Sequence, residues 1–261
     1  MDYRNSDDLR VLVHEANDTQ IGLMLGVSSR TIREWRHKFG IKPSSVPDWG
    51  STKYSLNRSF FRFIDTPEKA YILGFIATDG YVHRNGKSLS IALMESDIDH
   101  LYAIRDALGG TNEIHIKTCS SGYQGGHRLA VLNLCSVELV RDLATLGIVP
   151  NKTFNLCFPS LPTHLESHFV CGLFDGDGHI SKRQFYLVGT LELLIGVRTA
   201  VQHHTGQLLS NRVVNDTTSR LIGYRRDHPV LAWMYDNATI ALKRKHEKWR
   251  MFWFRPSVPS L

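Results

Sequence analysis

One short apolar pattern occurs twice in the sequence, and each copy ends in Asp-Gly. The first copy, ILGFIATDG, spans residues 72–80, and the second, VCGLFDGDG, spans residues 170–178. Their closing acids, Asp79 and Asp177, lie roughly 100 residues apart, about the length of one small domain. Such a repeat predicts an internal duplication. Two similar halves suit a partner that is itself nearly two-fold symmetric, as a DNA duplex is.

Each copy places a glycine in the middle of an otherwise good helix, which costs about 1 kcal/mol relative to alanine. Gly74 lies one helical turn before Thr78, and Gly172 lies one turn before Gly176. Small residues therefore line one side of each expected helix. We expect the two helices to pack tightly against each other along these small residues.

The acids that close the two copies stand where stability alone would not place them. Gly80 and Gly178 are expected to end the helices in a left-handed conformation, which leaves each acid at the negative end of a helix dipole. Packed helices would also bring the two carboxylates together, where they repel. A divalent cation reverses both penalties, and Mg²⁺ binds carboxylates together with phosphate oxygens and water. We expect the metal ligands to be Asp79 and Asp177, with the backbone carbonyls of Thr78 and Gly176 as further candidates.

The composition narrows the functional class and the compartment. The chain has 261 residues and a formal net charge of +6, which favours a polyanionic partner. Its four cysteines form no CxxC pair, which argues against a zinc ribbon and for a reducing compartment. The first residues do not resemble a signal peptide, and no apolar run approaches the roughly 20 residues of a membrane span. We expect a cytoplasmic protein, from a prokaryote or phage, or an organellar one, with no membrane contact and no secretion.

Residues 1–42 are typical of a helix-turn-helix domain. We expect Asp18 to cap one helix, a turn at Gly26, and a second helix capped by a serine. A small helical bundle without a DNA-binding role is the simpler alternative. If the domain binds DNA, the contacts are expected from the start and the basic face of the second helix, at Ser28, Ser29, Arg30, Thr31, Arg33 and Arg36.

After this domain the chain repeats one series of elements. Residues 43–66 are rich in Pro and Ser and are expected to form a linker. In each half, a helix that carries the motif is followed by a hairpin, a second helix, two more strands and a third helix. The first hairpin is expected to turn at Asn85-Gly86. The expected boundaries are residues 67–149 for the first half, 150–162 for the connection, and 163–255 for the second half with its basic tail.

At these residues the chain resembles the LAGLIDADG homing endonucleases in their two-motif, single-chain form. The resemblance covers roughly residues 66–250, and it includes the lead-in DTPEKAYILG at residues 65–74. Asp79-Gly80 and Asp177-Gly178 match the metal-binding acid and the following glycine of that family. One position departs from the family pattern, because Ala77 stands in the first motif where Asp175 stands in the second.

The resemblance implies an α+β fold of two αββαββα units, whose antiparallel strands form a saddle over the DNA major groove. The motif helices would form the interface between the units. The implied activity is divalent-metal-dependent cleavage of both strands of DNA at a long recognition site, leaving short 3′ overhangs. Mg²⁺ is the expected cofactor, and Mn²⁺ or Ca²⁺ is expected to fit the same sites. The implied protein is a monomer that needs no protein partner.

The family also places basic residues near the acids, where they position water and stabilise the transition state. Candidates here are Arg225, Arg226, Lys243 and Lys245, with Lys152 as a weaker one. Basic residues on the strands and their turns are expected to contact phosphates. These candidates are His83, Arg84, Lys87, Lys117, Arg128, Lys182, Arg183, Arg212 and Arg220.

Several alternatives remain open. A DNA-binding regulator could use the same scaffold without cleaving DNA, although such a protein has no reason to keep both acids. An intron maturase that binds RNA is a second alternative, because the family includes such proteins. An inert interface between the two motif helices is a third. An intein is disfavoured, because the sequence lacks the splicing residues expected at its two ends.

Overall fold

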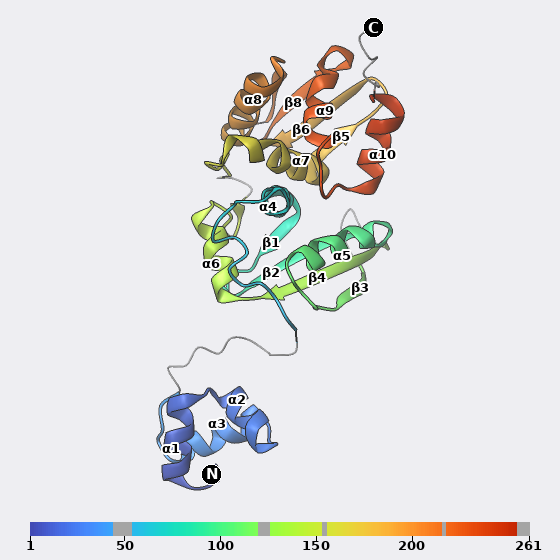
Figure 1. Cartoon of the computed structure of the whole chain (residues 1–261). Helices are drawn as coiled ribbons and strands as arrows, with labels where there is room; N and C mark the ends of the chain where they lie inside the picture. The colour runs from blue at the N-terminus through green and yellow to red at the C-terminus, as the bar shows by residue number, and fades with distance from the viewer. Residues whose placement is uncertain (44–53, 120–125, 153–155, 216–217, 255–261) are drawn as a thin grey trace. The chain divides into compact units, whose positions relative to one another are not determined.

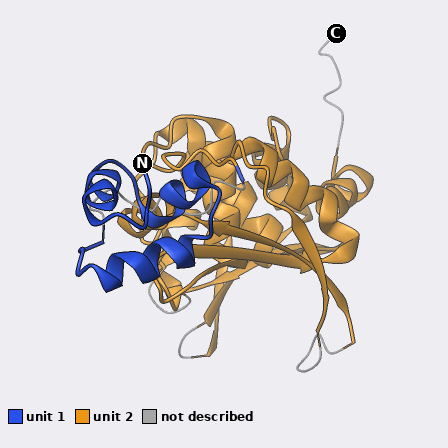
Figure 2. Ribbon diagram, turned by 90° about the horizontal axis from the view of Figure 1, so that it is seen from below, with its two compact units in different colours: residues 1–54 blue, residues 55–261 orange. Residues whose placement is uncertain are grey.

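The computed structural model divides into two compact units, Met1–Tyr54 and Ser55–Leu261 (Figure 2). Among the residues that are described, no helix has the length and apolarity needed to cross a bilayer. The structure describes residues 1–43, 54–119, 126–152, 156–215 and 218–254. Part of the expected linker (residues 44–53) and part of the expected connection between the halves (residues 153–155) therefore lie outside the described residues.

The described residues of the first unit form three helices, each capped at its start by an Asn or Ser side chain. Asn17 caps the second helix by accepting hydrogen bonds from the backbone N–H groups of Thr19 and Gln20, so the expected cap at Asp18 is wrong by one residue. Gly26, at φ 67°, makes the turn, and Ser28 caps the third helix. The helices are α1 (Ser6–Glu15), α2 (Asp18–Leu25) and α3 (Ser29–Lys38) (Figure 1).

The second unit repeats one order of elements, as the duplicated motif predicts. The first half contains α4 (Pro67–Asp79), β1 (Gly80–Val82), β2 (Ser88–Met94), α5 (Ile98–Ala107), β3 (Ile114–Thr118), β4 (Arg128–Cys135) and α6 (Val137–Thr145). The second contains α7 (Glu166–Asp177), β5 (Gly178–Ile180), β6 (Gln184–Gly189), α8 (Leu191–Thr205), β7 (Ser210–Asn215), β8 (Thr218–Tyr224) and α9 (His228–Tyr235). One further helix, α10 (Lys243–Phe252), follows, and short 3₁₀ turns lie at Glu95–Asp97, Thr163–Leu165 and Arg225–Asp227.

The two antiparallel sheets have matching strand orders, β1-β2-β4-β3 and β5-β6-β8-β7. Gly80 pairs with Ile91 in the first sheet, and Gly178 pairs with Leu187 in the second. The first hairpin turns at Gly86, as expected, with φ 66°. Within the second unit, helices cover one side of the strands, which curve away from them at both ends (Figure 2). The expected α+β class, with two αββαββα halves, is confirmed.

Helices α4 and α7 lie side by side in the middle of the second unit, in backbone contact (Figure 1). A Cβ atom on Gly74 would stand 2.1 Å from the carbonyl oxygen of Phe169, and one on Gly172 would stand 2.1 Å from that of Tyr71. These distances leave no room for any side chain at either position. The glycine pair therefore explains why both helices tolerate a residue that weakens them.

The glycines after the motif helices serve a different purpose from the one expected. Gly80 and Gly178 have φ −76° and −85°, so neither is left-handed, and the chain passes straight from helix into strand. A Cβ on Gly80 would lie 2.6 Å from the carbonyl oxygen of Ile76, and one on Gly178 would lie 2.3 Å from that of Phe174. Close contact with the preceding turn, rather than φ, excludes a side chain here.

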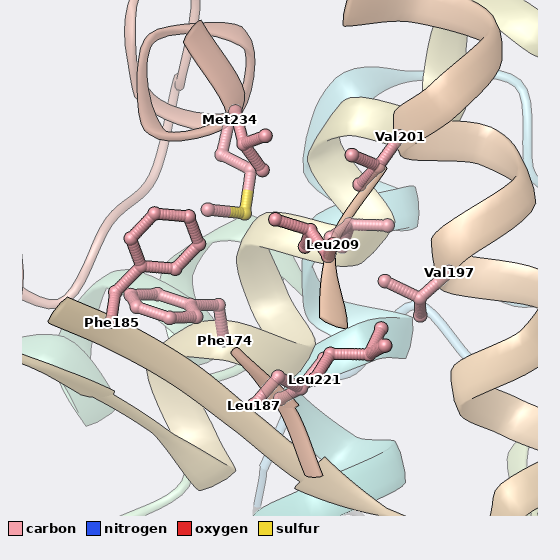
Figure 3. Close-up of a pocket in the computed structure, with 10 residues that line it drawn as sticks. Phe174, Phe185, Leu187, Val197, Val201, Leu209, Leu221 and Met234 are labelled. Atoms are coloured by element: carbon pink, nitrogen blue, oxygen red, sulfur yellow. The ribbon is translucent and has the colours of Figure 1, made fainter. Parts of the chain in front are cut away.

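Apolar side chains from both halves and from the segment before α4 make one core. In the second half, Phe174 from α7 meets Phe185 and Leu187 from β6 and Met234 from α9, around a small apolar cavity (Figure 3). Phe61 is fully buried in the same core. Residues 55–66 therefore belong to the second unit, which corrects the expectation of a linker up to residue 66.

Replacing either central glycine by alanine should destabilise the second unit. Helix propensity alone predicts that Gly74→Ala or Gly172→Ala stabilises the protein by about 1 kcal/mol. The clash with a backbone carbonyl predicts the opposite sign, a loss of about 1–3 kcal/mol or more in the free energy of unfolding. Urea denaturation measures the difference, with the exposed α10 substitution Glu247→Ala as the control. A gain in stability in both glycine variants would contradict the contact.

Candidate active site

The packed motif helices bring their last residues together. Asp79 ends α4 and Asp177 ends α7. A Cβ on Gly176 would stand 1.8 Å from the hydroxyl oxygen of Thr78 and 2.4 Å from Oδ2 of Asp79. The end of α4 thus occupies the space that a side chain on α7 would need. The small residue at this place allows the two carboxylates to share one end of the helix pair, as the sequence predicts.

The two acids are held in a setting that disfavours their charges. Burial, followed by repulsion from Asp177, raises the pKa of Asp79 to about 6. Burial also raises the pKa of Asp177, against the opposing attraction of Lys245 and Lys152. The like-charged pair therefore destabilises the folded chain at neutral pH, and a cation between the carboxylates would relieve the repulsion.

Lys245 lies at the end of α7, near the acids, as expected for one of the basic candidates. Its Nζ donates hydrogen bonds to the carbonyl oxygens of Phe174 and Asp175, both at 2.7 Å, and of Gly176, at 3.1 Å. The side chain is only 3% exposed. Burial lowers the pKa of Lys245 to about 8, so the ammonium is still mostly charged at pH 7.

Lys152, the weaker of the basic candidates, occupies the corresponding place at the end of α4. Its Nζ donates to the carbonyl oxygen of Gly80, and its side chain is buried. Burial lowers its pKa, against the opposing attraction of Asp79 and Asp177. The duplication offered a signal, because Lys152 and Lys245 follow their acids at nearly the same interval along the chain.

The other basic candidates are not brought to the acids. Arg225 donates to the carbonyl oxygen of Phe252 and lies over the Trp253 ring. That contact is at the far end of α10 from Lys245, along a helix of ten residues, about 15 Å long. The exposed Arg226 lies 3.8 Å from Asp227, and Lys243 is exposed at the first turn of α10.

The expected phosphate contacts all lie on the two sheets or their turns. Most of these side chains are exposed, but Arg220 stacks over Tyr186 at 4.2 Å and Arg128 pairs with Glu95 at 3.0 Å. His83 is half-buried. The exposed positions are Arg84 and Lys87 in the first hairpin, Lys117 on β3, Arg128 on β4, Lys182 and Arg183 before β6, and Arg212 on β7.

Two polar side chains on the first sheet, next to the candidate His83, escaped sequence reasoning. Ser90 on β2 faces Asn133 on β4, and its hydroxyl donates to the Oδ1 atom of Asn133 at 2.7 Å. The Nε2 atom of His83 lies 2.8 Å from the same hydroxyl. Ser90 and Asn133 each lie between buried neighbours on their strands. That alternation was the available signal, because it places them on the face away from the core.

In the first unit, α3 presents a narrower basic face than the sequence suggests. Arg36 is 5% exposed, and its guanidinium binds the carboxylate of Asp18 and the carbonyl oxygen of Ile41. The expectation that Arg36 lies on the exposed face is therefore wrong, because its guanidinium turns inward to pair with Asp18 at the start of α2. Arg30 and Arg33 are exposed on α3, together with the cap Ser28, whereas Ser29 and Thr31 are half-buried.

The acid pair fits a magnesium ion in its donor chemistry. Within the described residues, no three His, Cys, Asp or Glu side chains gather to hold an ion. Two carboxylates are nevertheless the usual protein share for Mg²⁺, which takes its other ligands from phosphate and water. The carbonyl of Gly176 already accepts a hydrogen bond from Lys245, which leaves Asp79 and Asp177 as the stronger ligands.

No family model and no curated protein matches the chain. Among solved structures, I-DmoI in complex with DNA and Ca is 15% identical over 75% of this chain and 99% of that chain, with a TM-score of 0.49. I-CpaMI bound to uncleaved DNA is 13% identical over 72% and 90%, with a TM-score of 0.49. The N-terminal domain of DUF199/WhiA is 14% identical over 73% and 83%, with a TM-score of 0.43. The DUF199/WhiA domain and I-CpaMI are LAGLIDADG proteins, and I-DmoI is a homing endonuclease.

Removing the charge of Asp79 should stabilise the folded protein at neutral pH. The raised pKa means that folding disfavours the carboxylate, so Asp79→Asn should raise the free energy of unfolding at pH 7 by roughly 1–3 kcal/mol. The advantage should shrink as the pH falls from about 6 to about 4, because the wild-type acid becomes neutral. Urea denaturation across this range measures it, with Asp236→Asn as the exposed control. An equal advantage at every pH would contradict the assigned cause.

Proposed function

We propose that the chain is a site-specific endonuclease that hydrolyses both strands of double-stranded DNA at a long site and depends on a divalent cation. The observation that carries the proposal is the shared end of α4 and α7. Each helix contributes one carboxylate with a raised pKa, and one buried lysine binds the backbone near the end of each helix. The two ends therefore form two similar centres. Two centres suit the two strands of a duplex.

Asp79 and Asp177 would hold Mg²⁺, or Mn²⁺ or Ca²⁺ in its place. A bound divalent ion would polarise the phosphate, activate water and neutralise the leaving 3′ oxygen. Lys245 would present a positive charge at the end of α7, and Lys152 would do so at the end of α4. Both ammonium groups would stabilise the negative charge that builds up on a phosphate during hydrolysis.

The two sheets would hold the DNA. Exposed Lys and Arg side chains on their strands and turns would contact phosphates, which orients the duplex without reading its sequence. The outward side chains between them, among them Ser90 and Asn133, would meet base edges in the major groove. Cutting both strands across the minor groove would leave short 3′ overhangs, as the sequence resemblance implies.

The first unit would add a second DNA contact through α3. Its exposed Arg30 and Arg33 stand one turn apart at most, beside the serine cap at the start of the helix. Both arginines also have acidic neighbours, because Arg30 pairs with Glu34 at 2.9 Å and Arg33 lies 3.8 Å from Asp18. Phosphates would compete for both guanidinium groups, because ion pairs of exposed arginines are weak in water.

Loss of either acid should abolish cleavage while binding persists. In a plasmid carrying the native target, Asp79→Asn or Asp177→Asn should lower the Mg²⁺-dependent cutting rate at least about 100-fold, because each acid supplies an ion ligand. A gel-shift titration should give DNA affinity within about threefold of wild type when Ca²⁺ replaces Mg²⁺. The control is Asp236→Asn, an exposed acid elsewhere in the unit.

Two results would contradict the proposal. Full cutting by both acid variants would remove them from the mechanism. Specific DNA binding by the wild type without cutting, in both Mg²⁺ and Mn²⁺, would favour a non-cleaving regulator. A competition experiment tests the maturase alternative. If the chain is a maturase, RNA should displace bound DNA.

Salt dependence should reveal the contribution of the first unit. If Arg30 and Arg33 contact phosphates, the double variant Arg30→Ala/Arg33→Ala should lower the slope of log affinity against log salt by about 2. Fluorescence anisotropy between low and high salt measures that slope. The control is Arg10→Ala, an exposed arginine on α1. An unchanged slope in the double variant would assign DNA binding to the second unit alone.

A further inference from the structure

Asp175 is a buried carboxylate that the proposed mechanism does not use. It stands two residues before Asp177 and is 1% exposed. Its Oδ1 accepts a hydrogen bond from the Tyr235 hydroxyl at 2.7 Å. Its Oδ2 accepts one from the Tyr71 hydroxyl at 2.6 Å and one from the backbone N–H of Leu242 at 2.6 Å. A buried carboxylate is tolerated only when it is satisfied in this way.

The three donors come from three separate parts of the second unit. Tyr71 belongs to α4 of the first half, Tyr235 ends α9, and Leu242 immediately precedes α10. Tyr71 also contacts His100 on α5, whose Nε2 lies 3.1 Å from the hydroxyl. Asp175 therefore ties the beginning of α10 to both motif helices.

The hydrogen bond from Leu242 to Asp175 fixes the position of the Lys245 backbone. Leu242 caps α10, and its carbonyl oxygen accepts the backbone N–H of Lys245 at 2.9 Å. Lys245 is thus one turn beyond the anchored residue, and its Nζ reaches the carbonyls at the end of α7. A shift at Leu242 would move the ammonium by a similar amount, and about 1 Å of misplacement costs on the order of 100-fold in rate.

The first motif has no such anchor. Ala77 occupies the position that corresponds to Asp175, and Lys152 contacts Gly80 from the connection between the halves. The position of Lys152 therefore does not depend on α10. The two otherwise similar centres therefore hold their lysines by different means.

We propose that Asp175 is a positioning residue, which holds Lys245 at the second centre by anchoring Leu242, while the first centre does without it. This inference rests on the proposed nuclease function for its effect on cleavage. Its geometric part concerns Lys245 alone and is testable without activity. The consequence for function is that the two DNA strands depend unequally on one buried acid.

The first readout is the chemical protection of two lysines in the full chain. Acetic anhydride labelling followed by peptide mass spectrometry compares the wild type with Asp175→Ala and Asp175→Asn. In Asp175→Ala, Lys245 should gain at least about fivefold in labelling rate while Lys152 keeps its wild-type protection. Asp175→Asn should retain protection at both lysines, because the amide oxygen can accept from Leu242 while the amide group donates to the Tyr235 oxygen.

The second readout is the cutting rate of each strand under single-turnover conditions. A duplex labelled at one 5′ end at a time, with enzyme in excess and Mg²⁺ present, gives the two rates separately. Asp175→Ala should slow one strand at least about tenfold and the other by less than about twofold, so that nicked DNA accumulates. Lys245→Ala should slow the same strand, and Asp175→Asn should restore most of its rate.

The outcomes distinguish this inference from the proposed function. Exposure of both lysines in Asp175→Ala would show a general loss of structure and overturn the positioning role. Protection of both lysines in Asp175→Ala would overturn it as well. Equal slowing of the two strands would overturn the asymmetry. If the wild type cuts no DNA, the nuclease proposal fails, while the labelling of Lys245 still decides whether Asp175 positions it.

Discussion

Direct backbone contact between α4 and α7 is the constraint on which the second unit depends. Gly74 faces the carbonyl of Phe169, and Gly172 faces that of Tyr71, at distances that admit no side chain. Once the helices are this close, their last residues must meet as well. The contact therefore creates the core between the halves and, at one end, a pair of acids that electrostatics alone would separate.

The charges at that end balance only partly. Burial raises the pKa of both Asp79 and Asp177, and it lowers the pKa of both Lys152 and Lys245. Among the described residues, neither the acids nor the lysines have partners that fully offset the cost of burying their charges. Each lysine binds backbone carbonyls rather than a carboxylate oxygen, so the acids keep their ligand capacity. An arrangement that leaves both signs under-compensated is suited to a ligand that brings both, such as a phosphate with its cation.

The sequence predicted the motif helices and their acids because the information is local. A glycine inside an apolar helix predicts close packing, and an acid at the end of that helix predicts a ligand, wherever the rest of the chain lies. Contacts across long sequence separations were less accessible, as Lys152 and Arg36 illustrate. Lys152 acts on a carbonyl more than 70 residues earlier, and Arg36 is buried by an acid on the preceding helix. Likewise, the reason for Gly80 is a steric contact that appears only once the helix runs straight into its strand.

The two halves differ at one position where the second half depends on the first. Asp175 sits in the second motif, yet one of its donors is Tyr71 from the first. Without that hydroxyl and the Leu242 amide, burial of the carboxylate would cost several kcal/mol. The second half therefore buries a carboxylate whose hydrogen bonds need residues of both halves. Ala77, at the matching position of the first half, has no polar atom that needs a partner. A chain with one anchored and one unanchored centre is no longer a symmetric pair, even though its strands and motif helices still follow the same order.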